Sequence, residues 1–159
     1  MHRLYYHVVW TTRDRRPLLD PGLARFLCHY LRGVARQERV HILEIGMVST
    51  HVHILIRAHP IADLTRLLQR LKGCSAAVAN KERASSTGVT LRWSKGYSIH
   101  TVGQRSLEAV RQYLRAQPNQ HPDERIAGWQ GDEPEYEGAA EEEWLDPGRA
   151  RIRARWPRG

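Results

Sequence analysis

The feature that most constrains the fold of this chain is a pair of apolar segments separated by only two residues. Residues 40–48 and 51–58 are rich in valine and isoleucine, and only Ser49 and Thr50 stand between them. Such segments favour β-strands, and so short a connection joins antiparallel neighbours, because a parallel crossover needs a much longer one. The sequence therefore predicts a β-hairpin at 40–58.

Periodic patterns on both sides of the hairpin predict the remaining elements. In chain order, the predicted elements are a strand at 4–12, a helix at 21–34, the hairpin, a helix at 61–78, a strand at 96–103 and a helix at 105–117. Asp20 and Pro21 are start signals for the first helix, and Pro118 ends the last one. The order β-α-β-β-α-β-α predicts an α+β fold with a ferredoxin-like antiparallel sheet and a C-terminal helix that bears Tyr113.

Charge divides the chain into two parts of opposite sign. Residues 1–125 carry 20 basic and 9 acidic side chains, a net charge of +11, whereas residues 126–159 carry 5 basic and 8 acidic ones, a net charge of −3. We therefore expect a compact basic domain at 1–125 and an acidic, then arginine-rich tail at 126–159. The tail is interpreted as a disordered, solubilising segment; the alternative is that its acidic part folds over the basic domain and competes with a polyanion.

The net charge of the whole chain, +8, indicates a polyanionic partner, and nucleic acid is the first candidate. Only three of the 25 basic residues are lysines, and the planar fork of arginine suits phosphate groups.

No apolar run approaches the roughly 20 residues of a membrane span, and the first residues lack the layout of a secretion signal, so a cytoplasmic location is expected. Cys28 and Cys74 fall in helical patterns and are expected in the core.

Two histidines lie two residues apart in the second strand of the hairpin. Because side chains alternate along a strand, His51 and His53 point to one face while Val52 and Ile54 point to the other. This pattern fits either a solvated polar face or a pair of metal ligands. Two ligands alone do not make a metal site.

The last predicted helix carries a tyrosine and a glutamine at helical spacing. Tyr113 and Gln117 are four residues apart and therefore project from one flank of the helix. One interpretation is a tyrosine at the edge of the core beside a solvent-facing glutamine. The other is a nucleophile with a carbonyl oxygen one turn away that completes a metal site.

With these features together, the sequence resembles the HUH single-tyrosine transposases, which are small enzymes of certain bacterial insertion sequences and their REP-associated relatives. The resemblance covers residues 5–121 and rests on YYHVVWTTRDRRPLL, THVHILI, LLQRLKGCSAAV and GYSIHTVG, followed by YLRAQ. It departs from the family at 48–50, where many relatives have a proline and an acidic residue, and in its additional acidic tail.

The resemblance implies a chemistry and a set of site residues. His51, His53 and Gln117 become ligands of a divalent metal, Mg²⁺ or Mn²⁺, although zinc also suits such a set. Tyr113 becomes the nucleophile that cleaves and rejoins single-stranded DNA through a 5′-phosphotyrosine intermediate. The resemblance further implies a DNA hairpin near the cleavage site and a homodimer, often one in which the tyrosine helix completes the metal site of its partner.

Candidate DNA contacts lie in three places. Phosphate contacts are expected in the turn after the first strand and on the second helix, from Arg13, Arg15, Arg16, Arg66, Arg70 and Lys72. An aromatic and basic cluster before the last strand could stack an unpaired base and consists of Trp93, Lys95 and Tyr97. A core role is an equal alternative for the tryptophan.

Two other functions compete with the transposase. One is a catalytically silent or domesticated nucleic-acid-binding regulator on the same fold, but a silent protein has no need for all four site residues. The other is a metal-dependent hydrolase of a small phosphoester in which Tyr113 is structural. A small substrate does not need the electrostatic field of a domain with a net charge of +11.

Overall fold

The computed structural model describes residues 3–131. All but the first six residues of the predicted tail lie outside this range. The sheet consists of β1 (Leu4–Thr11), β2 (Val40–Val48), β3 (His51–Ala58) and β4 (Ser98–Val102), in the spatial order β2-β3-β1-β4. Every neighbouring pair is antiparallel, and the hairpin closes with Val48 opposite His51. This arrangement confirms the predicted ferredoxin-like sheet.

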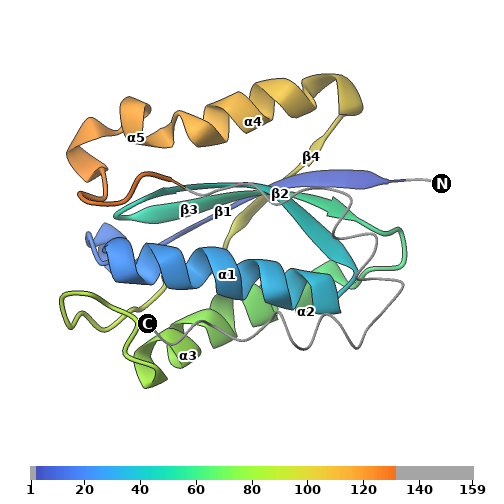
Figure 1. Ribbon diagram of the computed structural model, residues 1–159. Helices are drawn as coiled ribbons and strands as arrows, with labels where there is room; N and C mark the ends of the chain where they lie inside the picture. The colour runs from blue at the N-terminus through green and yellow to red at the C-terminus, as the bar shows by residue number, and fades with distance from the viewer. Residues whose placement is uncertain (1–2, 132–159) are drawn as a thin grey trace.

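Helices cover both faces of the sheet (Figure 1). One face packs against α1 (Pro21–Gln37) and a second helical run, which consists of α2 (Leu64–Leu68), the π-helical segment η2 (Gln69–Cys74) and α3 (Ser75–Lys81). The other face carries α4 (Leu107–Arg115) and α5 (Gln117–Gln120). Short 3₁₀ turns lie at η1 (Arg13–Arg15), η3 (Gln104–Ser106) and η4 (Pro122–Glu124).

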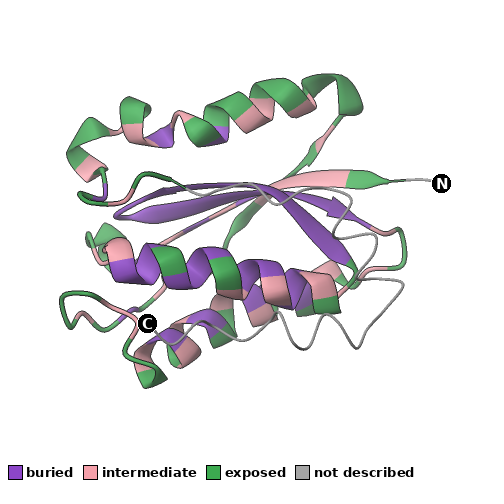
Figure 2. Cartoon of the chain, in the orientation of Figure 1, coloured by how far each residue is buried: buried purple, intermediate pink, exposed green. Residues whose placement is uncertain are grey.

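Double coverage explains why β2 and β3 are buried along their whole length (Figure 2). The main core lies between the sheet and α1, and a smaller cluster of Leu43, Leu55 and Leu114 lies between the sheet and α4. The polar residues of β3 are therefore enclosed by α4 and α5. The interpretation of their face as solvated is wrong.

The second helix differs from its prediction in two ways. It begins only after Asp63, whose side chain accepts a hydrogen bond from the Arg66 amide, so Ile61 precedes the helix and is 69% exposed. A π-helical segment also interrupts the run, and its last residue, Cys74, is exposed rather than part of the core. Cys28 is buried as expected.

The last helix is shorter than predicted. It ends at Arg115, Ala116 leaves helical geometry, and Gln117 opens a separate turn with Pro118 in its first positions. Proline lacks the amide proton that a continuing helix requires, which accounts for the break. Gln117 therefore does not share a helix with Tyr113, and the change of direction decides where its side chain points. Across residues 3–131, no helix has both the length and the apolarity to span a bilayer.

Candidate active site

The histidine pair lies at the start of β3, under α4 and α5. The His51 and His53 rings are 5.0 Å apart, centroid to centroid, and the residues are 7% and 6% exposed. Gln117 is fully buried, and its Oε1 lies 3.2 Å from Nε2 of His51. The break after α4 thus turns the glutamine inward, onto the histidines.

Hydrogen bonds from the protein fix the orientation of the Gln117 amide. Its Nε2 donates to the backbone carbonyl of Tyr113 at 3.4 Å, so its oxygen faces the histidines. The nucleophile candidate and the ligand candidate are therefore connected through the last turn of α4. A displacement of α4 would move both.

The Nδ1 atom of each histidine is occupied by a neighbouring side chain. Nδ1 of His51 lies 2.9 Å from Oγ1 of Thr50, and Nδ1 of His53 lies 2.9 Å from Nε2 of His7. Histidines that bind metals through Nε2 commonly have such a partner on the other nitrogen, because it holds the ring in place and selects the tautomer.

The hydrogen bonds around His51 leave its Nε2 lone pair free to bind a cation. The Thr50 hydroxyl donates its only proton to Oε1 of Glu124 at 2.8 Å, so it accepts the proton of His51 Nδ1. In neutral His51, the lone pair of Nε2 then faces the oxygen of Gln117, and two acceptors 3.2 Å apart repel unless a cation lies between them. Neighbouring donors about 2.1 Å from an octahedral cation are about 3.0 Å apart.

The electrostatic environment keeps the histidines neutral at pH 7. Burial lowers the pKa of His53 to about 3, and the charges of His51 and His7 act in the same direction. Burial also lowers the pKa of His51, against the opposing effects of Gln117 and Glu124. Neutral imidazoles keep the lone pairs that a metal requires. The donor set therefore fits a divalent cation, and its third protein donor is an amide oxygen. In the described part of the chain, no cluster of three His, Cys, Asp or Glu side chains is arranged for a metal.

Tyr113 lies beside this donor set and remains open to solvent. Its ring is 5.7 Å from that of His53 and 6.1 Å from that of His7, edge-on in both cases, and the residue is 41% exposed. The phenol is therefore accessible from solvent without any opening of the sheet. A tyrosine at the edge of the core would show similar exposure, so the exposure fits both interpretations of Tyr113.

Four residues of the site were missed at the sequence level. They are His7, Thr50, His121 and Glu124. The alternation along β1 puts His7 on the same face as Tyr5 and Val9, which was a usable signal. The η4 turn that brings Glu124 against Thr50 follows a break in the chain that no periodicity indicates.

An ion pair fastens α4 to β2. Glu44 is 2% exposed, in the middle of a strand whose only other polar side chain is that of His41. Its carboxylate lies 3.3 Å from Nε of Arg111 and 2.5 Å from a terminal guanidinium nitrogen of Arg115. These two arginines flank Tyr113 on α4. The pair therefore holds the tyrosine helix on its own sheet.

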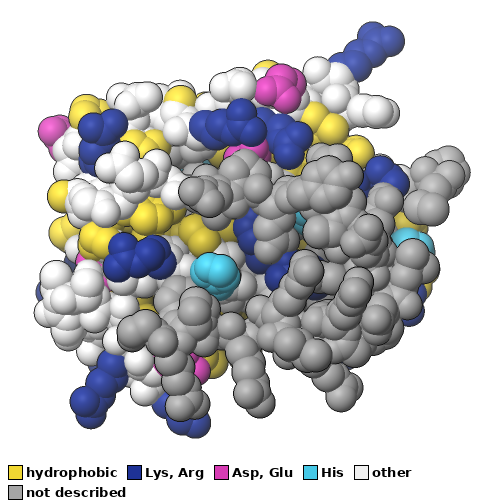
Figure 3. Space-filling view, viewed as in Figure 1, with side chains coloured by type: hydrophobic (Ala, Val, Ile, Leu, Met, Phe, Trp, Pro, Cys, Tyr) yellow, Lys and Arg dark blue, Asp and Glu magenta, His cyan; other side chains and the backbone are white. Residues whose placement is uncertain are grey.

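The predicted DNA contacts do not form one surface. Arg66 and Arg70 pair with Glu38, at the end of β3 remote from His51. Lys72 donates to the carbonyl of Gly96 at 2.7 Å, which brings it to the exposed loop that carries Lys95 and Tyr97. On the face seen in Figure 3, lysine and arginine side chains lie in several separate groups.

Trp93 has a packing role. It is half-buried, its indole nitrogen donates to Oγ of Ser75 at 3.0 Å, and its ring meets that of Trp10 edge-on with centroids 5.8 Å apart. These contacts favour the alternative that places it at the edge of the core. Arg13, Arg15 and Arg16 are exposed in and just after η1.

A ferredoxin-like sheet with paired histidines on a central strand, and a tyrosine helix over them, defines the HUH single-tyrosine class of transposases. The sequence profile of the IS200-like transposases matches residues 1–117. The chain therefore belongs to the IS200-like transposase family.

Individual relatives agree with this membership. The chain is 27% identical over 120 residues to the ISDra2 transposase TnpA of Deinococcus radiodurans, a match that covers 74% of this chain and 86% of that one. It is 26% identical over 116 residues to the IS200 transposase of Salmonella typhimurium, covering 70% and 75%.

Solved structures share the fold. A REP-associated tyrosine transposase bound to a REP hairpin matches with a TM-score of 0.59 and 16% identity, over 74% of this chain and 68% of that one. A structure from D. radiodurans R1 assigned as a transposase matches with a TM-score of 0.56 and 24% identity, over 80% and 95%.

Proposed function

We propose that this transposase cleaves and rejoins single-stranded DNA, with Tyr113 as the nucleophile and His51, His53 and Gln117 as ligands of Mg²⁺ or Mn²⁺. The observation that carries the proposal is the arrangement around Gln117. Its oxygen faces a histidine nitrogen across a gap suited to a cation, and its amide is held by the backbone of the tyrosine itself.

The covalent step conserves the energy of the phosphodiester. The phenol oxygen of Tyr113 attacks phosphorus, the bond to the 3′-oxygen breaks, and a 5′-phosphotyrosine and a free 3′-hydroxyl result. The phenol loses its proton and the leaving 3′-oxygen gains one. Attack by a 3′-hydroxyl reverses the step, so rejoining requires no nucleotide cofactor. A divalent cation at the site would supply polarisation of the scissile phosphate and stabilisation of its developing charge.

Several residues of this chain hold the groups of the proposed site in place for that step. Thr50 and His7 hold the histidine rings, and the turn at Ala116 brings Gln117 to them. In the structure of the single chain the donor set and Tyr113 lie together, and we propose this arrangement within one protomer. The homodimer, and a tyrosine helix that completes the metal site of its partner, remain expectations from the family resemblance.

The proposed DNA partner is a single strand with a hairpin near the cleavage site. The REP-associated relative with the same fold is bound to a hairpin, which supports this choice. The net charge of +11 on residues 1–125 supports a long polyanion rather than a small phosphoester.

A covalent-adduct assay tests the proposal. The full chain is incubated with Mn²⁺ and labelled single-stranded oligonucleotides drawn from both flanks of its own gene, with any inverted repeats intact. We expect a labelled adduct that survives denaturing electrophoresis, is absent with EDTA and is lost in Tyr113→Phe. Cleavage that persists in Tyr113→Phe would instead indicate a metal-activated water. Salt-sensitive binding to a flank hairpin without cleavage would indicate a regulator.

A further inference from the structure

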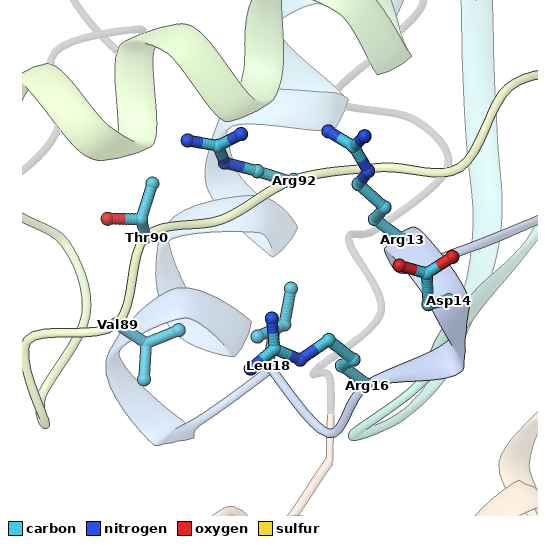
Figure 4. A pocket seen from close by; sticks show the side chains of 7 residues that line it. All are labelled: Arg13, Asp14, Arg16, Leu18, Val89, Thr90 and Arg92. Atoms are coloured by element: carbon cyan, nitrogen blue, oxygen red, sulfur yellow. The ribbon is translucent and has the colours of Figure 1, made fainter.

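A cleft separate from the histidine pair opens where β1 ends (Figure 4). It has a volume of about 630 Å³ and is lined by Arg13, Asp14, Arg16, Leu18, Val89, Thr90 and Arg92. We refer to it as the arginine cleft. Three of its residues are arginines, and they come from two loops far apart in the sequence.

Backbone hydrogen bonds hold the two loops together. The amide of Arg13 donates to the carbonyl of Arg92 at 2.9 Å, and Thr12 and Trp93 pair as an isolated antiparallel bridge. The amide of Ser94 donates to the carbonyl of Thr11 at 2.9 Å. The arginine cleft is therefore built on an extension of the sheet.

The first loop adopts a conformation that side chains other than glycine rarely take. Asp14 and Arg15 have φ angles of 56° and 52°, in the left-handed region. The Thr12 hydroxyl stabilises this turn by donating to the carbonyl of Arg16 at 2.6 Å. The tight turn brings Arg13 and Arg16 to the same cleft, and such local strain occurs most often at functional positions.

Within residues 3–131, the positive charges of the arginine cleft exceed the negative charge beside them. Arg13, Arg16 and Arg92 are exposed, and none of them forms an ion pair with another residue in the range 3–131. The Asp14 carboxylate offsets only one of the three positive charges. Guanidinium groups match the oxygens of a phosphate, while Leu18 and Val89 provide apolar surface for a sugar or a base.

The arginine cleft also lies close to the proposed cleavage site. Thr11 pairs with His51 across β1 and β3, and Arg13 follows two residues later, about 7 Å along an extended chain. A DNA strand that passes the histidine pair at this end of the sheet needs to extend only a short way to reach the cleft. Arg66 and Arg70 pair with Glu38, which precedes β2 by two residues, and therefore lie toward the other end of β3.

We propose that the arginine cleft binds a phosphodiester of the single strand next to the scissile phosphate, with Arg92 as a ligand alongside Arg13 and Arg16. This inference rests on the proposed function for the identity of the strand. It adds a second anchoring point, which holds DNA independently of the metal and of Tyr113. Arg92 had no signal in the sequence, because only the pairing of two distant loops gives it these neighbours.

The test measures binding without cleavage, so that it stands apart from the proposed chemistry. The full chain in a Tyr113→Phe background is titrated against a fluorescent single-stranded oligonucleotide from its gene flank, at several salt concentrations. Removing one phosphate contact reduces the slope of log K against log salt by about 0.7 for single-stranded DNA. We expect that reduction for Arg92→Gln, with several-fold weaker binding at low salt.

Two further variants make the result specific to the arginine cleft. Arg105→Gln removes the same charge at η3, near the opposite end of β1, and is expected to retain the full slope. Asp14→Asn is expected to tighten binding, because it removes a repulsive charge and asparagine tolerates the left-handed region. A tighter complex cannot result from a folding defect.

Several outcomes overturn the inference. It is wrong if Arg92→Gln and Arg105→Gln give the same slope, or if Asp14→Asn weakens binding. An equal loss of affinity for a blunt duplex of the same sequence overturns the assignment to the single strand. A competition experiment separates the two sources of phosphate. Sodium phosphate should not displace the oligonucleotide more strongly than sodium chloride of equal ionic strength if the cleft is specific for a phosphodiester. Stronger displacement that depends on Arg92 would show that the cleft also binds free phosphate, and would overturn its assignment to the strand alone. A failed adduct assay, by contrast, leaves these binding results unaffected.

Discussion

Gly46 of β2 lies directly against the backbone of Leu114 in α4. A β-carbon at Gly46 would be only 2.3 Å from the carbonyl oxygen of Leu114, so no larger residue fits without a shift of the helix. Gly46 also pairs with His53 across the sheet, and Leu114 directly follows Tyr113. This close approach therefore sets the distance between the tyrosine helix and the histidine strand.

The substitution Gly46→Ala is expected to displace α4 while the core on the other face of the sheet stays intact. Overpacking of this kind costs about 1–3 kcal/mol of stability, and a shift of about 1 Å at a reacting group can reduce its rate about 100-fold. Adduct formation and the thermal midpoint report the two effects. Gly73→Ala, whose β-carbon would meet nothing within 4 Å, is the matched control. Full adduct formation by Gly46→Ala would show that α4 tolerates the displacement.

The variant Glu44→Gln is expected to weaken the attachment of the same helix by another route. It preserves the shape of a side chain that is 3% exposed but leaves Arg111 and Arg115 without their counter-charge. Breaking a buried pair costs about 3–5 kcal/mol, and the half-exposed Arg115 reduces that figure here. Urea unfolding measures the loss. In a double-mutant cycle with Arg115→Gln, the two losses should not add, and simple additivity would show that the pair is not coupled.

The sequence was sufficient to predict the sheet and the histidine face, but not the connections that complete the site. A two-residue hairpin and regular alternation determine where His51 and His53 point, because both rules are local. The position of Gln117 depends on the break that Pro118 imposes after α4, and helical spacing alone placed it on the wrong side of that break. Glu44 shows the same limit: an acid inside VHILEIGMV indicates a buried partner, but not which helix supplies it.

The burial of the histidines was likewise beyond local rules. Alternation identifies two faces of β3 but does not show that a second layer of helices covers the polar one. His7 contacts His53 only because β1 lies beside β3, which is a matter of sheet order. Arg92 and Arg13 meet for the same reason, through pairing between loops that are distant in sequence.

Acid is expected to destabilise the start of α1 through Asp20. Burial tends to raise the pKa of this carboxyl, but hydrogen bonds from the Leu23 amide, the Ser85 and Thr87 hydroxyls and the Ser86 amide lower it from 3.8 to about 2. Because the folded pKa is the lower one, the contribution is complete above about pH 4 and disappears as the pH falls through 2.

The variant Asp20→Asn retains a capping oxygen and removes only the charge. After allowance for solvent screening of this partly exposed group, it should be less stable than the parent by about 1 kcal/mol at pH 7. The difference should shrink as the pH falls through 2, because the folded-state carboxyl of Asp20 takes up its proton there, and it should vanish only below that pH. Urea unfolding at pH 7 and below pH 2 checks this, and a difference that does not change with pH would show that the carboxylate charge contributes nothing.

The Thr50 hydroxyl is expected to support the metal without touching it. Thr50→Val keeps the shape of the side chain but removes the acceptor for His51 Nδ1–H and the donor to Glu124. Loss of such a partner typically weakens metal binding about 10- to 100-fold. Calorimetric titration with Mn²⁺ measures this directly, without DNA. Thr101→Val on the exposed edge strand β4 is the control and should bind as the parent does. If Thr50→Val binds Mn²⁺ as tightly as the parent, the hydroxyl does not orient His51, and the proton count that places a cation between His51 and Gln117 loses its basis.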